Sequence, residues 1–376
     1  MWTDRVLNRL SREILTRVPL PPSWLGYRYL RDRDPLRGDA LLIDPPGVAH
    51  VPLPLNIPTR DELPRDRGGW GFSMHDVPER AMEPTYIATV PNCRILSAPD
   101  EWGDLHYAIV DDRGAVLRVR GTGFVRELHA PLMKCDAVPL ARATWILEQW
   151  DQNYSHWLQW HLVKIAMLQK HGRADALLLP AASRLAPVID RSLQALGVDR
   201  AAAHTLSSPV VAVDRLTVAG MDHYRDTLAG DLRDRLVVAS RKQRRLFISR
   251  AKAGWRRLRN EEACWPILES FGFERVLMED YDFDEQRRLI GEAAVIAGPH
   301  GTGLANMIFA VPGLHVIEIY DAAFPNPQFY ALAGALGHHY WLVRGTPAGD
   351  FRPGYHDIDA DVAELRVVLA EVQKRK

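Results

Sequence analysis

The sequence contains few cysteines and few lysines, and its charges cancel. The three cysteines, Cys93, Cys135 and Cys264, lie far apart and form no CxxC pair. They argue against a disulfide framework and a zinc site, and we expect reduced thiols in the core of a cytosolic protein. The 47 basic and 47 acidic residues give a net charge of zero, which excludes a global field that would attract nucleic acid or an anionic membrane.

The sequence also lacks a long apolar run. The N-terminus mixes charges into every turn, unlike a signal peptide, and residues 1–18 place apolar side chains on one face of a helix. We expect this helix to pack on the protein, with a membrane-surface anchor as the alternative. Residues 295–320 have no charge before Glu318, but their glycines and prolines favour two buried parallel strands joined by a loop and a short helix. The sequence thus predicts no transmembrane helix.

Changes in residue pattern predict the domain organisation. At 376 residues the chain is longer than one hydrophobic core usually supports, so two domains are expected. Residues 1–92, rich in proline, glycine and aspartate, are predicted to be an irregular lead-in, and 93–237 to be a mixed domain with a helix over 145–169. Repeated strand-helix units predict a second domain over 238–350, followed by a C-terminal helix in 351–376. The predicted fold class is α/β.

The strand-helix alternation is clearest after residue 244, where one unit covers about 25–30 residues, as in a doubly wound parallel sheet. Asn260 is placed to cap the first helix, and Asp282 with Glu285 has the spacing of a capping box before the second. The predicted strands cover 245–250, 274–279, 294–298 and 314–320, and the predicted helices 261–272 and 283–293.

The strongest local motif is GPHGTGLAN, which begins at the end of the strand over 294–298. A glycine-rich turn at the carboxyl end of a parallel strand exposes backbone N–H groups and a helix start, which together bind phosphate. Its histidine can donate to a diphosphate oxygen. A tight structural turn with a solvent-facing histidine is the alternative. The residues predicted to bind a phosphate-bearing ligand here are Gly298, His300, Gly301, Thr302, Gly303 and Asn306.

Charged residues on neighbouring strands extend this prediction. Arg250 ends a strand before a basic loop, and we expect Arg250 and Arg257 to bind the same anion. Glu318 lies in an apolar strand, where a buried carboxylate needs hydrogen-bond donors such as a ribose diol, unless it lies at the exposed strand end. The other basic residues of the loop are interpreted as a solvated face: Lys252, Arg256 and Arg259.

A third motif, WDQNYSHWLQWHLVK, covers residues 150–164. Asn153 and His156 lie one helical turn apart, beside Trp157 and Trp160, so one turn can present an amide, an imidazole and flat aromatic faces. Sugars bind to such a mixture of polar groups and apolar surfaces. The alternative is a half-buried aromatic helix in which the tryptophans belong to the core.

Together these motifs resemble glycosyltransferase family 61. The matching segments are NYSHWL (153–158), ISRAKAGWRRLRNEE (248–262) and GPHGTGLANMIFA to VIEI (298–319), whereas residues 1–92 show no resemblance. The resemblance implies a GT-B fold, with two Rossmann-like domains facing across a cleft, and inversion at the anomeric carbon. It also implies a nucleotide-sugar donor, expected to be UDP-linked, an oligosaccharide or lipid-linked glycan acceptor, and no cofactor.

The resemblance further implies that no divalent metal is needed. The sequence agrees, because it contains no clear DxD-like pair at a strand end, and we expect no metal-binding residues. Charge on the leaving diphosphate is then expected to be met by Arg250, Arg257, His300 and the loop amides.

Inversion requires a base within reach of the acceptor hydroxyl. His156 is the first candidate, because an unperturbed histidine titrates near neutral pH, and Asn153 is expected to position the acceptor. The carboxylates that stay open as alternatives are Asp151, Asp222 and Glu148.

The predicted function is an inverting, metal-independent glycosyltransferase of bacterial surface polysaccharide biosynthesis, of the capsule or lipopolysaccharide type. We expect it in the cytoplasm, at most peripherally at the inner face of the membrane, with no nucleic-acid partner. Two alternatives stay open: a nucleotide-sugar 2-epimerase of the same fold and a non-catalytic glycan-binding protein.

Overall fold

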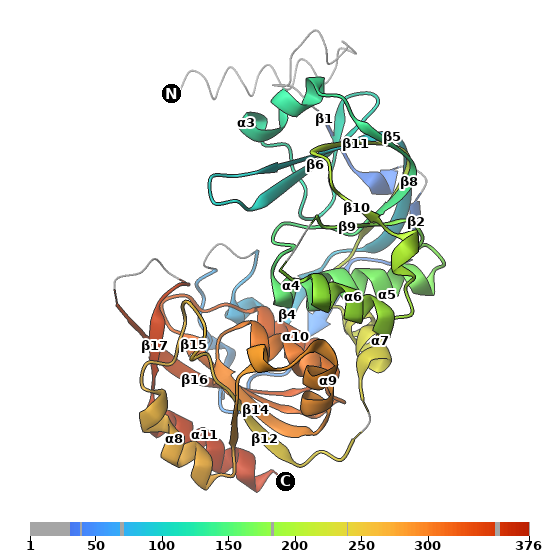
Figure 1. Cartoon of the computed structure of the whole chain (residues 1–376). Helices are drawn as coiled ribbons and strands as arrows, with labels where there is room; N and C mark the ends of the chain where they lie inside the picture. Colours follow the sequence, from blue (N-terminus) through green and yellow to red (C-terminus); the bar gives the residue numbers. More distant parts are fainter. Residues whose placement is uncertain are drawn as a thin grey trace, which may run out of the picture.

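The computed structural model describes residues 31–37, 40–67, 71–181, 184–238, 240–349 and 354–375. The amphipathic helix predicted for 1–18 lies outside these residues. Two β-sheets lie at opposite ends of the described chain, and a layer of helices lies between them (Figure 1). This arrangement confirms the mixed α/β class, and the predicted domain boundaries stay predictions.

The first sheet mixes parallel and antiparallel strands. In the described chain its nine strands run in the order β1-β7-β6-β5-β11-β8-β9-β10, with β2 paired to β5. β5 is antiparallel to β2, β6 and β11, whereas β8 is parallel to β11 and β9. A Rossmann-like domain would be parallel here. The difference arises because β5 and β6 are joined by a short hairpin, which only antiparallel strands allow. The strands are β1 (Arg31–Arg33), β2 (Ala40–Asp44), β5 (Thr85–Pro99), β6 (Leu105–Asp111), β7 (Ala115–Leu117), β8 (Val138–Trp145), β9 (Leu177–Leu179), β10 (His204–Thr205) and β11 (Val210–Gly220).

The lead-in predicted to be irregular contains strands where it is described. β2 and the start of β5 belong to the first sheet, and β3 (Gly47–His50) pairs antiparallel with β4 (Glu79–Met82). Pattern alone missed these strands because they are short or, as in β2 with Leu41 and Leu42 exposed, do not alternate between apolar and polar residues.

The second sheet is the parallel sheet that the sequence predicts. Within the described residues its order is β13-β12-β14-β15-β16-β17, and only the edge pair β16-β17 is antiparallel. Helices α8 and α11 cover one face, and α9, α10 and the 3-10 helix η9 cover the other, so its strands are apolar on both faces. The elements are β12 (Arg244–Ile248), α8 (Glu261–Ser270), β13 (Glu274–Val276), α9 (Phe283–Gly291), β14 (Ala293–Pro299), η9 (Thr302–Phe309), β15 (His315–Asp321), α10 (Gln328–Leu336), β16 (His339–Ala348), β17 (Asp357–Ala360) and α11 (Val362–Lys374).

A segment of the N-terminal part reaches the second sheet. We call residues 51–57 the strap. The Leu55 N–H donates to the Tyr340 carbonyl of β16 at 2.8 Å, and the Asn56 side chain both donates to and accepts from the Leu342 backbone. The strap therefore satisfies backbone groups of β16 that would otherwise lack a neighbouring strand.

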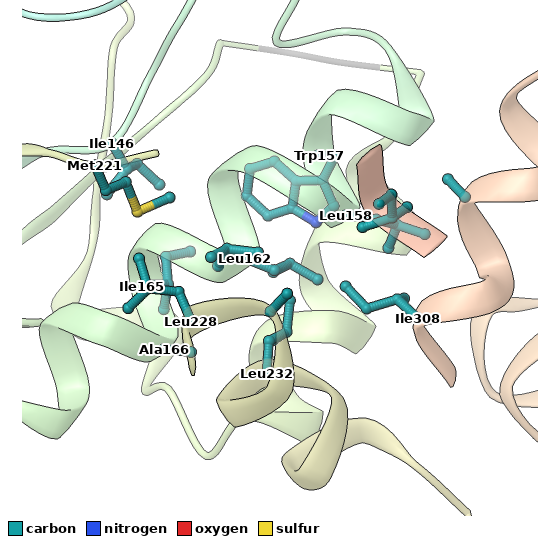
Figure 2. Packing of buried hydrophobic residues seen from close by; sticks show 14 of the residues in the cluster. Ile146, Trp157, Leu158, Leu162, Ile165, Ala166, Met221, Leu228, Leu232 and Ile308 are labelled. Carbon is teal, nitrogen blue, oxygen red and sulfur yellow. The ribbon is translucent and has the colours of Figure 1, made fainter. Parts of the chain in front are cut away.

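The helical layer between the sheets contains one continuous core. Leu158 and Leu162 lie on the side of their helix that faces Leu232 of α7 and Ile308 of η9 (Figure 2). These four side chains are buried completely or nearly so. The helices of the layer are α4 (Tyr154–His156), the π-helix η6 (Trp157–Leu162), α5 (Val163–Lys170), α6 (Ala186–Ala195) and α7 (Asp226–Leu236).

Several predicted local features differ in detail. The helix predicted over 145–169 begins at Tyr154, because β8 extends to Trp145. The predicted Asp282 capping box is confirmed, whereas the Asn260 side chain instead exchanges two hydrogen bonds with the Ala360 backbone of β17. The last 26 residues accordingly contain a sheet strand as well as the predicted helix.

The prediction of buried cysteines holds in part, and the prediction of strands in residues 295–320 is confirmed. Cys93 and Cys264 are buried as predicted, but Cys135 is exposed. Residues 295–320 form parallel strands β14 and β15 around η9, as predicted. Among the described helices, none has the length and apolar character needed to cross a membrane. The short helical elements of the described chain are η2 (Pro35–Arg37), η3 (Arg60–Glu62), η4 (Met74–Asp76), α3 (Arg126–His129), η5 (Pro131–Lys134), η7 (Arg200–Ala202) and η8 (Met278–Asp280).

Candidate functional site

The topology of the second sheet defines where a ligand fits. β12 lies between β13 and β14, so the chain winds to one side after β12 and to the other after β13. In open parallel sheets, ligands bind at such a switch point, outside the carboxyl ends of the strands. Arg250 follows β12 and His300 follows β14, so the two sequence motifs meet at this point.

Arg250 is fixed by the loop that follows it. Its Nε donates to the Arg256 carbonyl and its Nη2 to the Trp255 carbonyl, both at 2.9 Å. Burial, with repulsion from Arg256, lowers the pKa of Arg250 to about 10, so the guanidinium keeps its charge at neutral pH. A cation held in place by carbonyl groups is suited to meet an anionic ligand.

Three predicted glycines allow close packing within the protein. A Cβ on Gly301 would lie 2.1 Å from Nη1 of Arg250. A Cβ on Gly298 would lie 2.7 Å from the Ile248 carbonyl oxygen, and one on Gly303 would lie 2.7 Å from Cγ2 of Ile248. These glycines therefore let the loop pack against β12 and let Arg250 pass across Gly301.

Arg256 is the site residue that the sequence analysis missed. Interpreted as part of a solvated face, it instead points inward, where Tyr355, Glu318 and Asp321 interact with its charge, although burial lowers its pKa. Its backbone has a φ of 56°, a region that non-glycine residues seldom adopt. The signal that could have identified it is the loop itself, because reversing the chain after a buried strand turns some side chains back toward the sheet.

His300 and Glu318 are partners of each other. Nδ1 of His300 lies 2.5 Å from Oε1 of Glu318, and the Tyr340 hydroxyl donates to Oε2 of Glu318. Glu318 is fully buried, which excludes the alternative of an exposed strand end, and the donors that we expected from a ribose are supplied by protein groups. Burial raises the pKa of Glu318 well above its ordinary value and lowers the pKa of His300 well below its ordinary value, which favours the neutral form of both groups.

The protonation of Glu318 decides the tautomer of His300. With Glu318 neutral, its O–H donates to Nδ1 of His300, which leaves the proton of the imidazole on Nε2. The histidine then presents an N–H donor, in a site whose two nearby charges are Arg250 and Arg256. The expected role of His300 as a hydrogen-bond donor to an anion fits this arrangement.

Of the remaining residues predicted for this site, Arg257 and Asn306 form hydrogen bonds with other protein groups. Arg257 is exposed and forms hydrogen bonds with Asp357 through both its backbone and its guanidinium. Asn306 is fully buried, donates to Gln286 at 2.8 Å and accepts from the Tyr154 hydroxyl at 2.6 Å. Thr302 is half-buried at the start of η9. Lys252 and Arg259 form surface ion pairs with Asp280 and Asp359, as the solvated-face interpretation predicts.

In the part of the chain before β12, which we call the first half, the predicted catalytic residues have structural partners. The Asn153 amide oxygen accepts from the backbone of Ser155 and His156, so Asn153 caps α4. His156 is stacked on Trp160, with ring centroids 3.8 Å apart, and its other neighbour is Trp150. Burial, together with His161, lowers the pKa of His156 to about 3. The expectation that His156 titrates near neutral pH is therefore wrong.

The three alternative carboxylates differ in their surroundings. Asp222 is paired with Arg80 through two hydrogen bonds. Although burial acts in the opposite direction, Lys164 and His223 hold the pKa of Glu148 well below its ordinary range. Burial raises the pKa of Asp151, even though the Tyr107 hydroxyl and Gln152 donate to it. Asp151 is the one of the three whose basicity the structure increases.

The described residues include no group of three or more histidine, cysteine, aspartate or glutamate side chains that could hold a metal ion.

Comparison with known proteins agrees with this geometry. Residues 154–317, from α4 to β15, match the family model described as Glycosyltransferase 61, which confirms the resemblance over this part of the chain. A beta-1,2-xylosyltransferase of Oryza sativa subsp. japonica is 28% identical over 102 residues, which cover 24% of this chain and 19% of the relative. A beta-1,2-xylosyltransferase of Arabidopsis thaliana is 34% identical over 64 residues, covering 17% of this chain and 12% of the relative.

The matched segments thus span less than a fifth of each plant relative. The similarities support an enzyme of the glycosyltransferase class. These relatives are plant enzymes and give no support to the narrower expectation of a bacterial capsule or lipopolysaccharide protein.

Proposed function

We propose that the chain is an inverting, metal-independent glycosyltransferase that binds the diphosphate of a nucleotide sugar between Arg250, Arg256 and His300. The supporting observation is that these three side chains meet at the switch point of a parallel sheet, on loops that follow β12 and β14. The matched family segment includes all three residues.

The proposed chemistry is electrostatic. When the bond between the anomeric carbon and the diphosphate breaks, negative charge develops on the leaving oxygen. Two guanidinium groups and the Nε2–H of His300 are already oriented in a largely buried site, so they stabilise that charge without reorganising. Glu318 and Tyr340 do not touch the diphosphate in this proposal and act by holding the His300 ring and its tautomer.

The acceptor is proposed to bind on the side of the first half, with Asp151 as the base that takes the hydroxyl proton. Its raised pKa supports this assignment over His156, which burial makes a weak base. A GT-B arrangement is part of the proposal; the parallel second sheet supports it, whereas the mixed first sheet departs from a Rossmann-like domain. We further propose a UDP-linked donor, xylose as the first sugar to test, and a surface-polysaccharide acceptor in the cytoplasm.

A donor screen tests the proposal. The full chain is incubated with UDP-xylose and other nucleotide sugars plus oligosaccharide acceptors, with and without EDTA, and nucleotide release is measured. Acceptor-dependent release that survives EDTA is the expected result. Conversion of one nucleotide sugar into its epimer without an acceptor would favour the 2-epimerase, and glycan binding without any nucleotide binding would favour the non-catalytic protein. Loss of turnover in EDTA that Mn²⁺ restores would overturn metal independence.

A further inference from the structure

Beside the proposed diphosphate site lie two buried polar side chains, Asp321 and His356, near the half-buried Arg256. Asp321 ends β15, His356 precedes β17, and Arg256 comes from the loop after β12. Asp321 and His356 are 3% and 8% exposed, so each is more than nine-tenths buried. Asp321 and His356 lie 3.5 Å apart, and the charge of Arg256 interacts with that of Asp321, so Arg256 lies near this pair.

One polar atom of each residue lacks a hydrogen-bond partner within the described part of the chain: Oδ2 of Asp321, Nδ1 of His356 and Nε of Arg256. Oδ2 of Asp321 and Nδ1 of His356 are 3.5 Å apart, which is longer than a normal hydrogen bond. Asp321 is held in place by its other oxygen, which accepts from the Ala323 N–H at 2.8 Å. Buried polar groups usually have hydrogen-bond partners, so these three atoms, two of which lie within ion-pair distance of each other, can accept a further partner.

The chemistry of the three atoms defines that partner. A carboxylate oxygen accepts, a guanidinium N–H donates, and an imidazole nitrogen does either. A hydroxyl group both donates and accepts, and two neighbouring hydroxyls would satisfy all three atoms. We propose that Asp321, His356 and Arg256 form a subsite that binds a vicinal diol of the nucleotide sugar, either on the ribose or on the transferred sugar. Arg256 then contacts both the diphosphate and the diol.

This inference rests on the proposed function and adds the residues that select the donor. Glu318, the residue expected from sequence to bind a ribose, is instead bonded to His300 and Tyr340. The proposed diol contact is Asp321, which lies at the end of β15, three residues after Glu318.

Isothermal titration of the full chain with pyrophosphate, UDP and UDP-xylose tests the subsite. The informative variants are Asp321→Asn, which keeps the oxygen that accepts from Ala323, and His356→Gln. The matched control is Asp359→Asn, which removes a carboxylate charge from a surface ion pair on neighbouring β17. Both test variants should bind UDP-xylose about tenfold to a hundredfold more weakly than the unmodified chain, and the control should not. Pyrophosphate affinity should not change.

The UDP arm separates the two sources of the diol. Weaker UDP binding in Asp321→Asn places the ribose in the subsite, whereas unchanged UDP binding with weaker UDP-xylose binding places the sugar there. Unchanged affinity for both nucleotides in both variants, or a lower melting temperature as the only effect, would overturn the subsite and leave the proposed function intact. If the unmodified chain binds neither nucleotide, the proposed function fails, and the subsite fails with it.

Discussion

Arg250 combines a side chain that the loop holds in place with a positive charge in the proposed diphosphate site. Two of its N–H donors are used by backbone carbonyls, and Nη1 remains beside Gly301. We expect Arg250→Ala to weaken UDP binding about tenfold to a hundredfold, because a lost hydrogen bond to a charged group costs about 1.5–3 kcal/mol. Titration calorimetry with UDP measures the change.

Arg259→Ala is the matched control for Arg250. Arg259 belongs to the same loop and has the same charge, but it is paired with Asp359 on the surface. Equal weakening in the two variants would mean that the general positive potential of the loop, rather than a specific contact, binds the nucleotide. Arg257→Ala tests the sequence prediction that Arg257 binds the same anion, because the structure pairs that side chain with Asp357 instead.

The pH dependence of turnover distinguishes Asp151 from His156 as the catalytic base. A base must be deprotonated, so turnover falls as the pH drops through its pKa. Burial raises the pKa of Asp151, which places the acidic limb of the profile above the ordinary aspartate value of about 3.9, whereas a limb due to His156 would lie near pH 3. We expect Asp151→Asn to lower turnover about 10²–10⁴-fold and to remove the limb.

His156→Gln supplies the comparison for the base. It should leave the position of the acidic limb unchanged, whatever its effect on the rate through packing against Trp160. A limb that disappears in His156→Gln and persists in Asp151→Asn would show that the histidine is the base after all.

At the scale of elements, the loop between β14 and η9 is shaped by its glycines. Gly301 has an extended backbone, so alanine is not strained there, but its Cβ would displace the end of the Arg250 side chain. At Gly298 the Cβ would meet the Ile248 carbonyl oxygen, which is fixed in the sheet. We expect Gly301→Ala to keep the fold and weaken UDP binding about as much as Arg250→Ala, and Gly298→Ala to lower the melting temperature.

Thermal melts and calorimetry on both glycine variants check this contrast. A Gly301→Ala protein that melts far below the unmodified chain would mean that the loop, and not Arg250 alone, depends on that glycine. Unchanged UDP affinity in a well-folded Gly301→Ala protein would remove Arg250 from the site.

The elements also show how far sequence reasoning extends. The second sheet was predictable because strands buried on both faces appear as short apolar runs, as in β14 and β15, and helix starts have local signals such as Asp282. Roles that depend on distant partners were not predictable. Glu318 was expected to need a ligand, but the Tyr340 hydroxyl comes from the next strand, 22 residues later. Likewise, His156 is buried by aromatic rings whose positions only the fold determines.

At the scale of the whole molecule, the two halves share one interior. The core around Leu158 and Ile308 is continuous from the first half to η9 (Figure 2). The strap joins the N-terminal part to β16. Loss of either half would expose apolar surface on the other. We infer that donor and acceptor sides are held at a fixed separation rather than joined by a flexible linker.

Tyr154 tests this coupling. It begins α4, and its hydroxyl donates to Asn306 of η9 at 2.6 Å and lies 2.9 Å from the amide oxygen of Gln286 in α9. Tyr154→Phe would leave a buried amide oxygen without this donor, so we expect it to lower the free energy of unfolding by about 1–3 kcal/mol. Because both halves share the core, urea unfolding followed by circular dichroism and by tryptophan fluorescence should remain one coincident transition.

Ser192→Ala is the matched control, since it removes the hydrogen bond from Trp157 within the first half only. Two separate transitions in the unmodified chain, with Tyr154→Phe shifting neither, would show that the halves fold independently and that the separation of donor and acceptor sides is not fixed by the core.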